Sequence, residues 1–189
     1  NIDIAAATRH NIVVGNTPGV LTDATADLTM LLILATARRA IEADQFTRSG
    51  QFTGWKPELL LGHDVSGATL GLAGFGRIAR ATALRAAAFG MNIIFCSHPP
   101  AGRLVDQGEL ARLPYAARQV SWNELVESSD FLSLHVPLDT TTRHLVDPAV
   151  LAAMKPTAIL VNTARGPIID ENALVYALRD GRLAGAGLD

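Results

Sequence analysis

The chain has 189 residues, of which 49% are hydrophobic and 18% are charged, and its formal net charge is −2. This composition is typical of a folded domain and argues against disorder, while the nearly neutral charge excludes a strongly basic surface for nucleic acid or anionic lipid. The longest apolar run, residues 30–35, is far shorter than the roughly 20 residues of a membrane-spanning helix. The single cysteine, Cys96, is expected to be a buried, reduced thiol, and we expect a cytoplasmic protein.

The first fifty residues differ from the rest of the chain. They predict a strand over 12–16, a turn over 17–19, and one long helix over 22–49 that ends at Gly50. The first half of this helix is mostly apolar, so it is expected to be buried against something larger than one face of a sheet. We interpret this region as the end of one domain and the connector into the next. The ends at Asn1 and Asp189 suggest a piece of a longer protein.

From residue 66 onward, short apolar runs alternate with helical patterns. This alternation predicts βαβ units and a doubly wound parallel sheet, which is an α/β fold. In chain order, we expect strands over 68–74, 91–97, 117–120, 130–136, 157–162 and 183–189, with helices over 77–89, 104–113, 121–129, 147–154 and 170–181. Ser121 and Glu124 form a capping-box pattern at the start of one of these helices.

The stretch "GFGRIA" fits the pattern G-x-G-x-x-G/A between the first of these strands and the following helix. Gly74 permits the tight turn, Gly76 allows backbone to approach a pyrophosphate, and Ala79 lets the helix pack closely on the strand. The helix N-terminus then favours the phosphates. A glycine-rich turn without a ligand is the alternative, but the strand and helix around this pattern favour dinucleotide binding.

The residue that ends the second strand distinguishes NAD from NADP. An acidic residue there would hold the adenosine ribose and repel a 2′-phosphate, but this position is Ser97. His98 and Arg103 follow as groups that are cationic or can become so. We therefore predict NADP in preference to NAD. The alternative is that Ser97 binds a ribose hydroxyl and NAD binds adequately.

Several stretches together resemble the D-isomer-specific 2-hydroxyacid dehydrogenases. They are "NIDIAAATRHNIVVGNTPGVLTDATAD", "GATLGLAGFGRIA", "LHVPLDTTTRHLV" and "ILVNTARGPIIDENALVYALRDGRLAGAGLD". The runs "TPGVLTDATAD" and "LLLGHDVSGATLG" most resemble the glyoxylate/hydroxypyruvate reductase branch. The resemblance implies a Rossmann-like nucleotide domain over 51–189, an interdomain helix over 19–50, and the end of a flavodoxin-like substrate domain over 1–18. It also implies a homodimer, with the long helix contributing to the dimer interface.

The resemblance also implies roles for individual residues. Arg165 matches the catalytic arginine, which would grip the carboxylate of a 2-oxoacid and polarise its carbonyl. A salt-bridge role is the alternative for this residue. Cofactor binding is implied for Arg77 and Ile78 at the pyrophosphate, Val136, Pro137 and Thr142 along the adenosine and ribose, and Thr25, Thr163, Ala164 and Asp189 toward the nicotinamide. For Thr25 and Thr142, ordinary threonines at helix starts are the alternative.

A proton donor must complete the reduction of a carbonyl, and a histidine held by a carboxylate suits that task near pH 7. In the resembling family this His and Glu follow the "GLD" motif and so lie outside the 189 residues. His135 is the candidate within them because it ends a predicted strand, but the resemblance places it beside the cofactor. His144 falls in a helical pattern and is expected to be structural. The spacing of the His, Cys, Asp and Glu residues predicts no metal site.

We therefore expect an enzyme that reduces a small 2-oxoacid, such as glyoxylate or hydroxypyruvate, with NAD(P)H. The 189 residues alone are expected to bind dinucleotide weakly and to turn over nothing measurable. Two alternatives stay open. One is a dehydrogenase-like corepressor or regulatory protein that binds dinucleotide. The other is an enzyme of the same family that acts on formate, phosphite or 3-phosphoglycerate.

Overall fold

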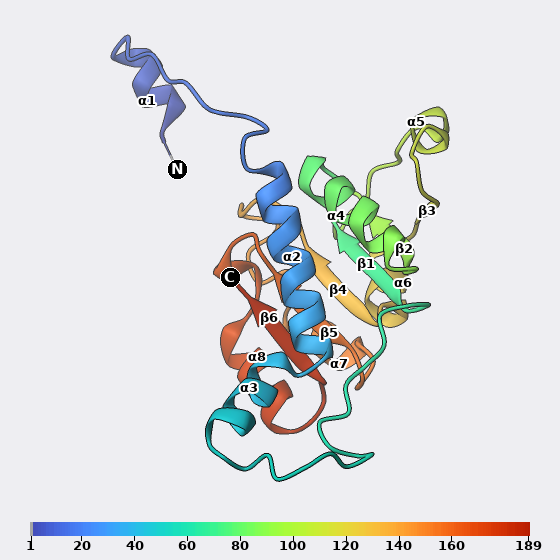
Figure 1. The fold of residues 1–189 in the computed structure, drawn as a ribbon. Helices are drawn as coiled ribbons and strands as arrows, with labels where there is room; N and C mark the ends of the chain where they lie inside the picture. Colours follow the sequence, from blue (N-terminus) through green and yellow to red (C-terminus); the bar gives the residue numbers. More distant parts are fainter. Residues whose placement is uncertain (1) are drawn as a thin grey trace.

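In the computed structural model, which describes residues 2–189, six parallel strands form one sheet in the order β3-β2-β1-β4-β5-β6 (Figure 1). The strands are β1 (Thr69–Ala73), β2 (Asn92–Cys96), β3 (Ala117–Gln119), β4 (Phe131–Leu134), β5 (Ile159–Asn162) and β6 (Gly185–Leu188). The order runs outward from β1 in both directions, which is the doubly wound arrangement of the Rossmann fold. The predicted fold class is confirmed.

Helices cover both faces of this sheet. One face carries α2 (Thr22–Ala37) and α4 (Arg77–Ala88), and the opposite face carries α6 (Trp122–Ser128), α7 (Pro148–Ala153) and α8 (Glu171–Arg179) (Figure 1). Three further elements, α3 (Ala40–Arg48), α5 (Gln107–Ala111) and the 3₁₀ turn η1 (Gly166–Ile168), lie in the connections. The helix start predicted at Ser121 is present, since the Ser121 hydroxyl accepts a hydrogen bond from the Glu124 N–H.

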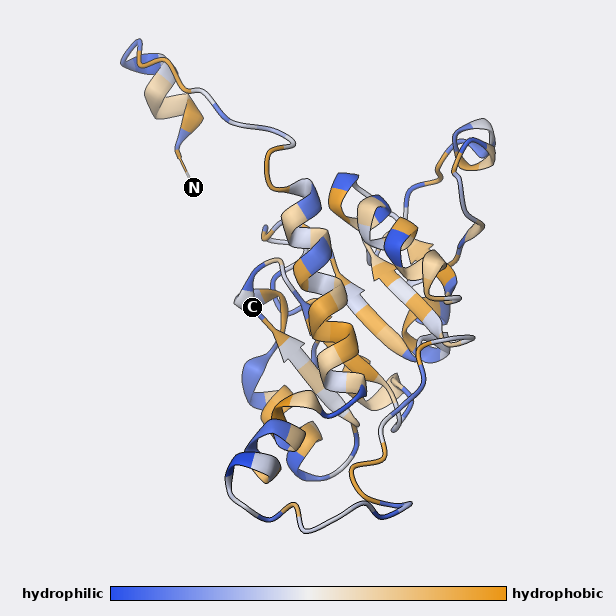
Figure 2. Ribbon diagram, viewed as in Figure 1, coloured by the Kyte–Doolittle hydropathy of each residue, from blue (hydrophilic) through white to orange (hydrophobic). Residues whose placement is uncertain are grey.

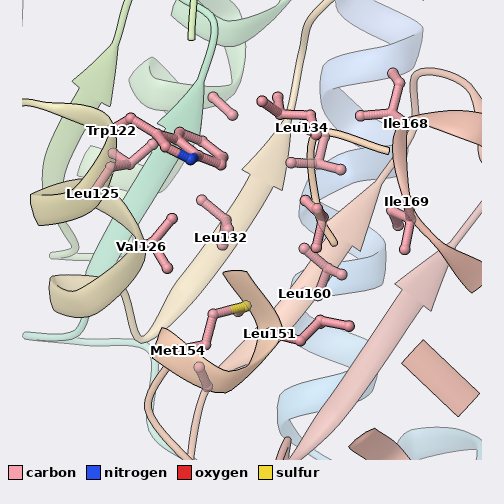
Figure 3. Packing of buried hydrophobic residues seen from close by; sticks show 14 of the residues in the cluster. Trp122, Leu125, Val126, Leu132, Leu134, Leu151, Met154, Leu160, Ile168 and Ile169 are labelled. Atoms are coloured by element: carbon pink, nitrogen blue, oxygen red, sulfur yellow. The ribbon is translucent and has the colours of Figure 1, made fainter. Parts of the chain in front are cut away.

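Each face of the sheet has its own apolar core. On the α2 and α4 face, Ile33 and Ala83 pack with Leu70, Leu72 and other residues of the strands. On the other face, the core includes residues of α6, β4, α7 and β5 and the residue after α7, Met154 (Figure 3): Trp122, Leu125, Val126, Leu132, Leu134, Leu151, Met154 and Leu160. The strands between these two cores, β1, β2, β4 and β5, are therefore mostly apolar (Figure 2), as expected of a buried parallel sheet, whereas the edge strand β3 contains Arg118 and Gln119.

The strand register brings three strand ends to one level. Ala73, the last residue of β1, pairs with Cys96 of β2 on one side and with Leu134 of β4 on the other. The sheet order reverses between β1 and β4, and open α/β sheets bind ligands at the carboxyl ends of strands at such a switch point. The loops that begin at Gly74, Ser97 and His135 therefore meet at this edge.

The predicted strand over 12–16 is wrong. These residues form no strand, and Ile12, Val13 and Val14 are exposed, with 95% of Val13 accessible. A strand is stable only when its backbone groups pair, and within residues 2–189 none of the six strands lies beside this segment. Instead, a short helix, α1 (Ile4–Arg9), precedes the segment, and both lie away from the sheet (Figure 1).

The long helix predicted over 22–49 is two helices. The backbone leaves the helical conformation at Arg39, whose φ is 52°, and a new helix begins at Ala40. The Ala37 carbonyl, which a continuous helix would bond to residue 41, accepts instead from the His63 N–H at 2.8 Å. The returning loop therefore caps the end of α2. The proposed domain boundaries stay predictions, although α2 packs directly on β5 and β6.

The predicted helical setting of His144 is also wrong. This residue lies in a turn with φ of 53°, and its N–H donates to the Pro167 carbonyl at 2.9 Å.

No helix within residues 2–189 is long and apolar enough to cross a membrane. Over the same residues, no group of three His, Cys, Asp or Glu side chains is placed to hold a metal ion.

Candidate dinucleotide-binding cleft

The turn after β1 has the geometry that its glycines predict. Gly74 has φ of 97°, and a Cβ there would lie 2.7 Å from the His135 carbonyl oxygen, so the position requires glycine. Gly76 differs, because a Cβ there would meet no other atom of the described residues within 4 Å. It precedes the first turn of α4, whose N–H groups donate to no capping side chain. The open space and the free N–H groups suit an approaching phosphate.

Two adjoining cavities follow the carboxyl ends of the strands. The first, here called the glycine-turn cleft, has a volume of about 440 Å³ and extends from Gly74 and Gly76 to Ser97 and Thr142. The second, the α2 cleft, has a volume of about 670 Å³, and the residues that line it include Thr25, Ile78, Thr163, Ala164 and Arg165. Both are lined by His135, Val136 and Pro137, so they adjoin at the switch point, and the two clefts together are here called the groove.

The groove gathers most of the residues that were predicted from the sequence to bind the cofactor or the substrate. The glycine-turn cleft is lined by Gly74, Gly76, Ser97, His98 and Thr142, and the α2 cleft is lined by Thr25, Ile78, Thr163, Ala164 and Arg165. Val136 and Pro137 line both clefts. Three other predicted residues, Arg77, Arg103 and Asp189, are exposed and line neither cleft. Their roles stay predictions.

Ser97 and His98 form one polar unit at the end of β2. The Ser97 hydroxyl lies 2.9 Å from Nδ1 of His98, and Ser97 is buried while His98 is exposed. The Arg103 N–H donates to the Ser97 carbonyl at 2.8 Å, which returns the backbone of the loop to the end of the strand. Asp139 is the only acidic residue among the described residues that line this cleft.

The loop after β4 is held by its own hydrogen bonds. The Thr142 hydroxyl donates to the Pro137 carbonyl at 2.6 Å and accepts from the Asp139 N–H at 2.9 Å. The Asp139 carboxylate accepts from the hydroxyl and N–H of Thr141, and these bonds lower the pKa of Asp139. Thr142 therefore shapes the wall of the cleft through its loop, which is a role that sequence reasoning did not assign to it.

His135 lies where the two clefts join. Its Nε2 is 2.9 Å from the Ser133 hydroxyl, and burial lowers the pKa of the imidazole to about 4. Burial has this effect because removing water penalises the charged form. The ring is therefore neutral near pH 7 and is not the protonated imidazolium that acts as a general acid. Its place beside a cofactor stays a prediction.

The loop after β5 carries Arg165 and depends on a residue that the sequence did not single out. The amide of Asn162, which is buried, donates from Nδ2 to the Arg165 carbonyl and accepts at Oδ1 from the Ala164 N–H, both at 2.9 Å. The exposed Arg165 guanidinium donates to the Ala164 carbonyl at 2.7 Å. The available signal was a polar residue at the end of an otherwise apolar strand, directly before the motif that contains Arg165.

Taken together, the parallel sheet, the glycine turn and the groove at the switch point define a dinucleotide-binding α/β domain. The family described as "D-isomer specific 2-hydroxyacid dehydrogenase, NAD binding domain" matches residues 30–189. The chain belongs to this family, and its domain is one that binds NAD(P).

Individual relatives agree with this assignment. The chain is similar to a glyoxylate reductase of Thermococcus litoralis, with 50% identity over 100% of the chain and 56% of the relative. Among solved structures, it resembles the TT0316 protein from Thermus thermophilus, with 49% identity and a TM-score of 0.89 over 100% of the chain and 56% of that protein. It also resembles a glyoxylate reductase from Paecilomyes thermophila, with 42% identity and a TM-score of 0.86 over 100% and 54%. The chain thus spans about half the length of the relatives it matches.

Proposed function

We propose that the protein containing this chain reduces a small 2-oxoacid of the glyoxylate or hydroxypyruvate kind to the D-2-hydroxyacid, using NAD(P)H. The observation that carries this proposal is the position of Arg165, which lines the same cleft as Ile78 and Thr163. The similarity to reductases named for glyoxylate supports the substrate class.

The residues of the groove have different tasks in its two parts. The glycine turn and the start of α4 bind the pyrophosphate, and Ser97 and His98 lie toward the adenosine ribose. A bound dinucleotide supplies a hydride to the carbonyl carbon of the substrate. Arg165 binds the substrate carboxylate in a bidentate manner and polarises the adjacent carbonyl, whose oxygen gains negative charge as the hydride arrives. That oxygen then takes a proton from a histidine paired with a glutamate, which the family resemblance implies beyond the 189 residues.

The assignment of Arg165 can be tested in the intact protein with glyoxylate and NADPH. Arg165→Lys keeps the charge but loses the planar fork, so we expect kcat/KM to fall by at least about 100-fold, which corresponds to about 2.7 kcal/mol. Arg118→Lys is the matched control, because Arg118 pairs with Glu124 at 2.7 Å, is 63% exposed, and lies away from the groove.

A protein that binds dinucleotide but oxidises NADPH with none of a panel of 2-oxoacids would instead support the regulatory alternative. Turnover of formate, phosphite or 3-phosphoglycerate in place of glyoxylate would support the other alternative.

We also propose that NADP is preferred over NAD. The support is that Ser97 and His98, neither of which is acidic, lie in the groove at the position where an acidic residue would repel a 2′-phosphate. Ser97→Asp should weaken NADPH binding by at least about tenfold, through repulsion and loss of the hydroxyl, while NADH binding is retained. Dissociation constants for both cofactors measure this effect, with Ser97→Ala as the uncharged control. Equal affinity of the unchanged protein for NADH and NADPH would show that the preference is wrong.

The homodimer is a further part of the proposal. Leu31 of α2 and Ile41 of α3 are 59% and 69% exposed, which leaves apolar surface on the helices that the resemblance assigns to the dimer interface. Light scattering of the intact protein should give twice the mass of one chain. Leu31→Glu together with Ile41→Glu should shift that mass to a monomer.

A further inference from the structure

A line of hydrogen bonds through two threonine hydroxyls connects α2 to the loop that carries Arg165. The Thr29 hydroxyl lies 2.8 Å from the Thr25 carbonyl oxygen, one helical turn earlier, and 3.0 Å from the Thr163 hydroxyl. Thr29 is completely buried, whereas Thr163 is partly exposed and lines the α2 cleft. The inner end of this line is therefore enclosed by protein, and its outer end faces the groove.

The number of protons sets the direction of these hydrogen bonds. A carbonyl oxygen can only accept, so the single hydroxyl proton of Thr29 is donated to Thr25. Thr29 then has only lone pairs for its second partner, and the proton between the two hydroxyls must come from Thr163. The Thr163 hydroxyl thus donates its one proton to Thr29 and presents only lone pairs to the groove.

The neighbouring backbone N–H also donates its hydrogen bond away from the groove. The Ala164 N–H is occupied by Oδ1 of Asn162, so this second donor of the loop is also turned away from the groove. The wall made by Thr163 and Ala164 therefore offers a hydrogen-bond acceptor beside the Arg165 side chain. A ligand group that binds there through Thr163 must be a donor.

We propose that Thr29 is a positioning residue that makes Thr163 an obligatory acceptor for the carboxamide NH₂ of the bound nicotinamide. This inference rests on the proposed function, because it assigns the α2 cleft to the nicotinamide end of the dinucleotide. It predicts a preference for a pyridine ring that carries a carboxamide over one whose NH₂ is replaced by a methyl group. A ring without the NH₂ leaves the Thr163 lone pairs unpaired when water is displaced.

The test compares NADP⁺ with 3-acetylpyridine adenine dinucleotide phosphate, which keeps the ring carbonyl but lacks the NH₂ group. Dissociation constants for the intact protein are measured by calorimetry. We expect the unchanged protein to favour the carboxamide by about fivefold to tenfold, which is the effect of one net hydrogen bond. Thr163→Val should reduce this ratio to about one.

Thr29→Val tests the positioning role itself. It removes the acceptor for the Thr163 proton, so Thr163 can donate to the acetyl oxygen, and the ratio should fall at least about threefold. Thr29→Ser keeps the hydroxyl and should keep the ratio. Thr82→Val is the matched control, because Thr82 is an equally buried threonine whose hydroxyl donates to the carbonyl one turn earlier, Ile78, on α4.

The outcomes separate this inference from the function on which it rests. Equal binding of both dinucleotides by the unchanged protein would overturn the inference alone. So would a Thr29→Val protein that weakens both dinucleotides equally, because a merely structural role has that effect. Failure of the unchanged protein to bind any dinucleotide would overturn the proposed function and the inference with it.

Discussion

The two parts of the groove are built in different ways. The glycine-turn cleft depends on backbone, since the turn at Gly74 passes against the His135 carbonyl and α4 begins without a capping side chain. The α2 cleft depends on side chains, since Asn162, Thr29 and Thr163 hold the loop of Arg165 and join it to a helix far away in the sequence. The first construction tolerates no added side chain at Gly74. The second is sensitive to the loss of individual hydrogen bonds.

The largest expected effect is at the glycine turn, where two glycines give a matched pair. Gly74→Ala places a Cβ against the His135 carbonyl at a positive φ, so we expect the free energy of unfolding to fall by about 3 kcal/mol. Gly76→Ala meets open space and should cost less than about 1 kcal/mol, yet weaken dinucleotide binding because its Cβ enters the space left for the pyrophosphate. Urea denaturation and dinucleotide titration measure the two effects. Equal stability of both variants would contradict the claim that the close approach of backbone at Gly74 shapes the glycine-turn cleft.

The next effect concerns Asn162 and the α2 cleft. Asn162→Ala leaves the Arg165 carbonyl and the Ala164 N–H without their partner, which we expect to cost about 2 kcal/mol of stability. In the intact protein kcat should fall more than dinucleotide affinity, because Arg165 loses its position. Asn92→Ala removes an asparagine bond to the exposed Gly67 carbonyl, away from the groove, and should leave kcat unchanged. If Asn162→Ala lowered only stability, the loop of Arg165 would not depend on this side chain.

The smallest effect lies at the junction of the two clefts. The pKa of His135 is lowered from 6.5 to about 4 in the folded chain, so the unfolded chain binds more protons between these values. The contribution of His135 to stability is therefore complete above pH 6.5 and is lost as the pH falls toward 4. Between pH 7 and pH 5 we expect a loss of at most about 2 kcal/mol. Urea denaturation at several pH values should show a smaller slope for His135→Asn. If the free energy of unfolding of His135→Asn depended on pH as strongly as that of the unchanged protein, His135 would be excluded as the source of this dependence.

Much of the fold could be predicted because its signals are local. The pattern of apolar runs predicted all six strands of the sheet, and Gly74, Gly76 and Ala79 predicted the turn into α4. The strand predicted over 12–16 failed because a β-branched apolar run has strand propensity whether or not a partner is present. The break at Arg39 was not predictable from the helical pattern, because it depends on a hydrogen bond from His63 in a loop that returns from later in the chain.

By itself, the sequence determined the alternation of strands and helices, the dinucleotide turn and the motif around Arg165. Each of these features depends only on residues that are close together in the sequence. Only the tertiary structure decided that α2 packs beside β5, that Thr29 reaches Thr163, and that His135 becomes neutral at the junction of the clefts. These features depend on contacts between residues that are distant in sequence, such as the 134 positions between Thr29 and Thr163. Local periodicity carries no information about such pairs.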